Sequence, residues 1–115
     1  MKSFSFLVFL LLLVGCEQSK KMPITDFSQS DIKNGILIDV RTPEEYGMGH
    51  LESAVNVNVL DDSFASYFDD ISKSKTLYVY CKKGGRSAKA AKSLEEMGFT
   101  VVDLLGGYDA LHPDE

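Results

Sequence analysis

The sequence predicts an α/β fold, a mainly parallel sheet with helices on both faces. Four short apolar runs have the composition of β-strands, at residues 36–40, 54–57, 76–80 and 100–104. The first of them, Ile-Leu-Ile-Asp-Val, does not alternate polar and apolar residues, which is typical of a strand buried on both faces. Segments with helical spacing separate the runs, and this succession favours a parallel sheet. Because 115 residues allow a single core, we expect one domain.

Helix signals lie on both sides of the first strand. Ser28 or Ser30 can cap a short helix that ends near Gly35. After the strand, Thr42 has the position of an N-cap and Pro43 that of the first helical residue, and two acidic residues complete the first turn. We therefore expect a second helix that begins at Pro43.

Two further helices are predicted in the second half of the chain. Phe64, Phe68 and Ile71 recur at helical spacing, which indicates a helix whose apolar stripe packs in the core. Residues 88–97 are expected to form the next helix, which Gly98 ends. After the last strand, a Gly-Gly turn leads into a short helical tail.

The N-terminus has the features of an export signal. Residues 1–15 carry a Lys near their start and an unbroken apolar run at residues 6–14, which is too short to cross a membrane as a helix. Leu-Val-Gly directly precedes Cys16, and this sequence resembles the lipobox of bacterial lipoproteins, in which the Cys carries the lipid. An ordinary signal peptide with a nearby Cys and a short uncleaved anchor are the alternatives.

The lipobox resemblance implies a division of the chain into three parts. Residues 1–15 are expected to be a lipoprotein signal peptide, residues 16–23 the lipidated Cys16 with a polar tether, and residues 24–115 the folded domain. The protein would then lie in the bacterial cell envelope, anchored to a membrane through lipid on Cys16 and facing the periplasm or the exterior.

The composition excludes several classes of function. The chain has 12 Lys and Arg against 17 Asp and Glu, and its net charge of -5 gives no reason to expect nucleic-acid binding. Two Cys cannot make a disulfide framework, and with two His they show no metal-ligand spacing, so we expect no metal. His50 is interpreted as a structural, hydrogen-bonding residue and His112 as an exposed one.

The turn after residues 76–80 is the strongest candidate for a site, because ligands of parallel sheets bind beyond the carboxyl ends of the strands. The glycines of this turn allow the backbone to curl so that amide N–H groups point inward, and a helix expected to begin at about residue 87 adds its positive end. Three basic side chains surround the sulfur, and all these features favour the thiolate, which is the nucleophilic form. The alternative is a buried structural Cys before a solvated turn. The turn consists of Cys81, Lys82, Lys83, Gly84, Gly85, Arg86 and Ser87.

Three motifs resemble those of rhodanese-like domains: residues 37–46 with 49–51 and 54–56, residues 80–87, and residues 105–108. The resemblance implies a single-domain sulfurtransferase. In that reaction Cys81 takes sulfur from thiosulfate or a similar donor, becomes a persulfide, and passes the sulfur to a thiol or a cyanide-like acceptor. The resemblance also implies that the loop amides stabilise the persulfide, that Arg86 binds the anionic donor, and that no cofactor is needed. We expect a monomer.

The length of the loop separates this activity from its nearest alternatives. Four residues lie between Cys81 and Arg86, whereas related phosphatases with a rhodanese-like fold carry one more. The shorter loop favours sulfur transfer over a phosphatase or an arsenate reductase. A non-catalytic module that binds a partner or senses sulfur or redox state through Cys81 is the remaining alternative.

Two charged residues, Asp39 and Arg41, lie at the end of the first strand. We interpret them as a structural ion pair, or as part of a network with Glu44 or Glu45, rather than as acid–base catalysts. Sulfur transfer from a persulfide needs no obligatory general base, so the chemistry does not require them.

Overall fold

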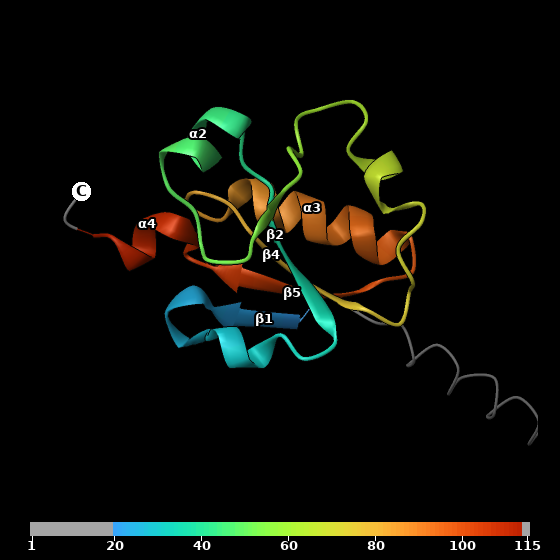
Figure 1. Cartoon of the computed structure of the whole chain (residues 1–115), viewed down its shortest axis with the longest axis horizontal. Coiled ribbons are helices and arrows are strands. Elements are labelled where there is room, and N and C mark those ends of the chain that lie inside the picture. Colours follow the sequence, from blue (N-terminus) through green and yellow to red (C-terminus); the bar gives the residue numbers. More distant parts are fainter. Residues whose placement is uncertain (1–19, 114–115) are drawn as a thin grey trace, which may run out of the picture.

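The computed structural model describes residues 20–113, which form a five-stranded, all-parallel sheet with helices on both faces (Figure 1). The α/β fold expected from the sequence is confirmed. The order of the strands is β1-β5-β4-β2-β3, with bounds Lys20–Pro23 (β1), Gly35–Asp39 (β2), Val55–Asn56 (β3), Thr76–Tyr80 (β4) and Thr100–Leu105 (β5). The α-helices are Pro43–Met48 (α2), Gly85–Glu96 (α3) and Gly107–Leu111 (α4), and the 3-10 turns are Ile24–Asp26 (η2), Gln29–Asp31 (η3) and Ala65–Phe68 (η4).

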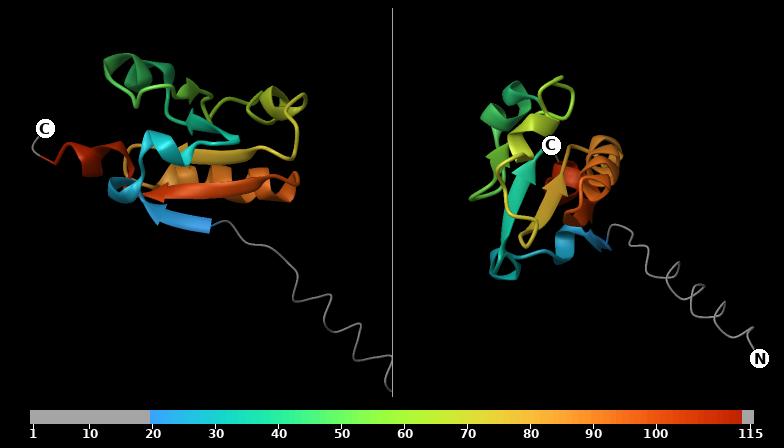
Figure 2. Two further views of the ribbon diagram at one scale, coloured as in Figure 1. Left: turned by 60° about the horizontal axis from the view of Figure 1, so that its bottom comes forward. Right: turned by 90° about the vertical axis from the view of Figure 1, so that its right-hand side faces the viewer.

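The sheet separates two apolar layers. In the end-on view of Figure 2, α3 runs along one side of the sheet, where Ala90 and Leu94 pack with Leu77 and Val79 of β4. The segment around η4 closes the same layer with two buried phenylalanine rings. Residues of η2, α2 and α4 cover the other face, in a cluster that includes Ile24, Leu37, Tyr46, Tyr80, Leu104 and Tyr108. Because both faces are covered, the central strands are apolar without alternation.

The first strand corrects the predicted tether. Lys20–Pro23 pairs in parallel with β5, with Lys20 beside Val102 and Pro23 beside Leu105, so these four residues, which were expected to belong to the tether, are part of the sheet. An edge strand has one neighbour and leaves much of its surface exposed, and in β1 only Met22 is partly buried. The sequence of such a strand therefore looks like that of a tether. Residues 1–19, with the predicted signal peptide and Cys16, lie outside the described residues.

The predicted helix before β2 is a single 3-10 turn. Ser28 caps η3 as expected, and the carboxylate of Asp31 accepts from the backbone N–H of Ser28 at 2.8 Å. Gly35 already opens β2, and a Cβ at this position would lie 2.5 Å from the carbonyl oxygen of Thr76. The glycine therefore marks a close approach of two strands and not the end of a helix.

The apolar stripe of the next segment lies in the core, but the backbone is not an α-helix. Phe64 and Phe68 are buried with their ring centroids 5.1 Å apart, and η4 covers only Ala65–Phe68. The spacing of the rings predicted their burial correctly, because a chain of turns brings them to the same side as a helix does. No helix among residues 20–113 is long and apolar enough to span a membrane.

Candidate active site

Cys81 follows the carboxyl end of β4, and its residue surface is 1% exposed. Two backbone amides of the loop donate to its sulfur: the N–H of Gly84 at 3.0 Å from Sγ and the N–H of Ser87 at 3.3 Å. The inward-pointing amides expected from the two loop glycines are therefore present. Amides that converge on a sulfur stabilise negative charge there.

The loop has this shape because glycines and α4 fix its backbone. Gly84 is the N-cap of α3 and adopts a φ of +120°, a conformation that residues with a side chain rarely adopt. The helix consequently begins at Gly85, earlier than the sequence predicts. On the other side, the N–H of Tyr108 donates to the carbonyl of Cys81 at 2.8 Å. Gly107 allows this contact, because a Cβ on it would collide with the carbonyl of Lys82.

A cavity of about 430 Å3 with basic walls opens beside the sulfur. Three of its four cations are paired with acids from other helices: Lys82 and Lys83 with Asp109 of α4, at 3.1 Å each, and Arg86 with Glu45 of α2, at 2.7 Å. The sequence predicted the positive charge around the sulfur but not the acids that compensate it. The residues that line the cavity are Cys81, Lys82, Lys83, Gly85, Arg86 and Lys89.

Arg86 and Glu45 form a two-pronged ion pair at the rim of this cavity. Nη1 and Nη2 of Arg86 donate to the two carboxylate oxygens of Glu45 at 2.7 and 3.0 Å. The hydrogen bond from Arg86 lowers the pKa of Glu45 to about 2, with burial opposing it and the backbone N–H of Thr42 adding to it. The ion pair ties α2 to the first turn of α3, so Arg86 is held at the site with its charge shared.

Asp39 and Arg41 form the predicted ion pair, buried below the loop. Nη2 of Arg41 lies 2.7 Å from Oδ2 of Asp39, and the hydroxyl of Tyr80 donates to the same oxygen at 2.8 Å. Nη2 of Arg41 also donates to the carbonyl of Gly49 at 2.6 Å. The carboxylate of Glu45 is not hydrogen-bonded to this pair and instead accepts from the guanidinium of Arg86 in α3. The pair therefore supports the strand ends around the site.

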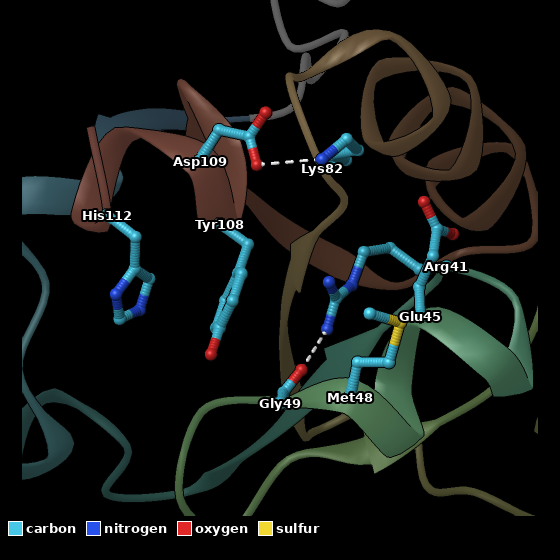
Figure 3. Close-up of a pocket in the computed structure, with 8 residues that line it drawn as sticks. All are labelled: Arg41, Glu45, Met48, Gly49, Lys82, Tyr108, Asp109 and His112. Atoms are coloured by element: carbon cyan, nitrogen blue, oxygen red, sulfur yellow. Dashed lines mark hydrogen bonds and ion pairs between the residues drawn. The ribbon is translucent and has the colours of Figure 1, made fainter. Parts of the chain in front are cut away.

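A second cavity, of about 220 Å3, lies between α2 and α4 (Figure 3). The guanidinium carbon of Arg41 lies 4.5 Å from the ring centroid of Tyr108, and Lys82 extends toward Asp109. His112 is partly buried in the wall and not exposed as predicted. The sequence did not indicate this cavity, because it depends on how two distant helices meet. The residues that line it are Arg41, Glu45, Met48, Gly49, Lys82, Tyr108, Asp109 and His112.

Comparison with known proteins places this arrangement in a family, because residues 25–113 match the rhodanese-like domain. The chain belongs to the rhodanese family. It is 38% identical over 84 residues to thiosulfate sulfurtransferase 16, chloroplastic, of Arabidopsis thaliana, and the alignment covers 64% of this chain and 70% of that protein. It is 39% identical over 72 residues to thiosulfate sulfurtransferase PspE of Escherichia coli K12, which covers 61% of this chain and 67% of that protein.

Two solved structures share the fold. The rhodanese-like domain protein of Staphylococcus aureus superposes with a TM-score of 0.70 at 29% identity, covering 79% of this chain and 89% of that one. SSP1007 of Staphylococcus saprophyticus gives a TM-score of 0.67 at 28% identity, with 82% and 92% covered. The single-domain rhodanese fold predicted from three motifs is therefore confirmed by sequence and by structure.

This rhodanese-like domain also buries a carboxyl group behind the loop, which sequence reasoning missed. Asp103 of β5 is 3% exposed, and its Oδ1 has no hydrogen-bond partner among the described residues. Burial raises the pKa of Asp103, and the Ser87 hydroxyl and Lys21 oppose the rise. Ser87 in turn donates through its N–H to the sulfur and through Oγ to the carbonyl of Gly84 at 3.2 Å. The signal in the sequence that could have indicated this buried carboxyl group is an Asp within an otherwise largely apolar strand.

The described histidines and acids of the rhodanese-like domain do not assemble a metal site. Within residues 20–113, no three His, Cys, Asp or Glu side chains lie together in a way that could hold a metal ion. Nδ1 of His50 lies 2.8 Å from the carbonyl oxygen of Tyr46, and the two rings stack at 3.6 Å between centroids. His50 thus has the hydrogen-bonding role expected from the sequence.

Proposed function

We propose that this rhodanese-like domain transfers sulfane sulfur through a persulfide on Cys81. The thiolate Sγ attacks the outer sulfur of thiosulfate or a similar donor, and the new S–S bond forms as the S–S bond of the donor breaks, so that sulfite leaves with the electron pair. A thiol or cyanide then attacks the outer sulfur of the persulfide, and the electron pair of the broken bond returns to Sγ. Both steps balance without an oxidant, a reductant or a cofactor.

The observation that carries the proposal is the pair of amide N–H groups directed at Sγ of Cys81. They donate at 3.0 and 3.3 Å to the atom that must hold negative charge before and after each transfer. The adjoining cavity of about 430 Å3 has room for a small donor and then for an acceptor. Similarity to two thiosulfate sulfurtransferases supports the same reaction class.

The test uses the full chain with Cys16→Ala, in which Cys81 is the only Cys. Thiosulfate and cyanide are added, and thiocyanate is measured. We expect turnover that disappears in Cys81→Ser, and turnover that survives this substitution would refute the site. If the protein instead hydrolyses an aryl phosphate or reduces arsenate without forming thiocyanate, the reaction class is wrong. A Cys81 that is reversibly oxidised without any turnover would indicate a sensing module.

The location of the protein is part of the proposal. We infer that lipid on Cys16 anchors the domain to a membrane of the bacterial cell envelope, on the strength of the short apolar run and the Leu-Val-Gly that precedes Cys16. Because β1 begins at Lys20, the sheet starts no more than about 14 Å along the chain from the lipidated residue. Cys16→Ala should release the protein from membranes, and unchanged retention would contradict lipidation.

A further inference from the structure

Asp109 of α4 faces the Cys81 loop and binds both of its lysines. Its Oδ1 lies 3.1 Å from Nζ of Lys82 and its Oδ2 lies 3.1 Å from Nζ of Lys83. Figure 3 shows Lys82 extending toward Asp109 along the wall of the second cavity. The hydrogen bonds from Lys82 and Lys83 lower the pKa of Asp109, so this group is a carboxylate at neutral pH.

The backbone fixes this carboxylate relative to the loop. The N–H of Asp109 donates to the carbonyl of Lys82 at 3.0 Å, and the N–H of Tyr108 donates to the carbonyl of Cys81 at 2.8 Å. These two bonds hold the first turn of α4 against the loop, so the backbone places Asp109 beside the lysines. An anion that approaches Cys81 therefore meets two cations that share one carboxylate, and this carboxylate lies behind them in the wall of the second cavity.

We propose that Asp109 is a specificity-determining residue that disfavours doubly charged sulfur donors relative to singly charged ones. The inference rests on the proposed function and concerns its donor: Asp109 reduces the advantage that the basic walls give to a dianion over a singly charged sulfane-sulfur compound, such as an organic thiosulfonate or persulfide. The repulsion between a donor and the carboxylate is proportional to the charge of the donor. A dianion such as thiosulfate is therefore penalised more than a monoanion that places its sulfur at the same position.

Solvent limits the size of the effect. The side chains are 48% exposed for Lys82, 77% for Lys83 and 35% for Asp109, so water and salt screen their charges. Exposed charge interactions of this kind change an equilibrium by about two- to fivefold. In Asp109→Asn we therefore expect KM for thiosulfate to fall by about two- to fivefold, and KM for a monoanionic thiosulfonate by about the square root of that factor.

A measurement on Cys81 alone tests the charge effect without any turnover. In the full chain with Cys16→Ala, the thiolate is alkylated by iodoacetate, an anion, or by iodoacetamide, which is neutral, and iodide leaves in both reactions. Asp109→Asn should raise the ratio of the iodoacetate rate to the iodoacetamide rate by about twofold. Asp109→Glu keeps the negative charge and should keep the parental ratio.

The matched control is Asp70→Asn, which removes an exposed acid in the connection that precedes β4, away from the carboxyl ends of the strands. It changes the net charge by the same amount and should leave the ratio unchanged. An unchanged ratio in Asp109→Asn, or an equal rise in Asp70→Asn, overturns the proposal. Added salt should reduce the difference between Asp109→Asn and its parent, because the effect is electrostatic.

Donor kinetics complete the test, with benzenethiosulfonate as the monoanion, thiosulfate as the dianion and cyanide as the acceptor. We expect the ratio of the thiosulfate KM to the benzenethiosulfonate KM to fall in Asp109→Asn, and an unchanged ratio contradicts the role of Asp109. If no variant forms thiocyanate with either donor, the proposed sulfurtransferase function fails. The alkylation ratio still decides the effect of Asp109 in that case, so the two failures are distinguishable.

Discussion

Removal of the charge of Glu45 is the perturbation whose effect the structure defines most closely. In Glu45→Gln the side chain keeps its size, and an amide oxygen can still accept from the N–H of Thr42, as Oε1 of Glu45 does at 3.0 Å. What the substitution removes is the charge that binds both Nη atoms of Arg86. The link between α2 and α3 is thereby weakened without a change in volume.

The magnitude follows from the pKa of Glu45, which is about 2 in the folded protein against an ordinary value of 4.5. Because the folded-state pKa is lowered, the carboxylate contributes stability that is complete above about pH 4.5 and is lost as the pH falls toward 2. At about 1.4 kcal/mol for each pKa unit, the upper bound is about 3.5 kcal/mol. Solvent screens the pair, whose side chains are 25% and 27% exposed, so we expect Glu45→Gln to lose about 1–2 kcal/mol at neutral pH.

Urea unfolding followed by circular dichroism measures this loss at neutral pH and near pH 2. The difference between Glu45→Gln and its parent should shrink at the lower pH, where Glu45 becomes protonated in the parent. Glu44→Gln, which removes an exposed acid from the same turn of α2, is the matched control and should cost less than about 0.5 kcal/mol. A loss of equal size in both variants, or a loss that is independent of pH, would refute the assignment of the stability to the ion pair with Arg86.

Three other substitutions have expected outcomes. Asp103→Asn should stabilise the protein by about 1 kcal/mol at neutral pH. Burial raises the pKa of Asp103, so the carboxylate destabilises the folded state at a pH above the ordinary carboxyl range, and the substitution removes this charge. A melting temperature that does not rise contradicts this. Gly107→Ala should cost about 2 kcal/mol or more and reduce thiocyanate formation, because its Cβ collides with the carbonyl of Lys82, whereas Gly47→Ala, with open space around its Cβ, should not destabilise. Phe68→Ala should cost about 3–5 kcal/mol in urea unfolding, and a cost below about 1 kcal/mol would contradict its place in the core.

The central part of the fold was predictable because its information is local. β2 and β4 are covered on both faces, so apolar residues follow one another in their sequences without alternation, and this pattern indicates a buried strand. The edge strand β1 could not be predicted in the same way, because only Met22 is partly buried and the remaining side chains face solvent. Its place in the sheet depends on β5, which lies far away in the sequence.

The same distinction applies to the site. The curl of the loop and the amides on Cys81 depend on adjacent residues such as Gly84, so the sequence predicts them. The partners of the loop cations are Glu45 and Asp109, which reach the site from α2 and α4. Such pairs depend on how the helices meet at the edge of the sheet, which the sequence does not show. The basic residues of the loop, counted without these acids, therefore overestimate the unpaired positive charge around the sulfur. The buried Asp103 is a further acid whose neighbours become known only from the fold.

The most direct test of sulfur transfer through Cys81 is the mass of the protein after a single half-reaction. The full chain with Cys16→Ala is mixed with thiosulfate in the absence of an acceptor, and the intact mass is measured before and after cyanide is added. We expect a gain of one sulfur atom on Cys81, its loss to cyanide as thiocyanate, and no gain in Cys81→Ser. A protein whose Cys81 takes up no sulfur from thiosulfate or from benzenethiosulfonate would contradict it.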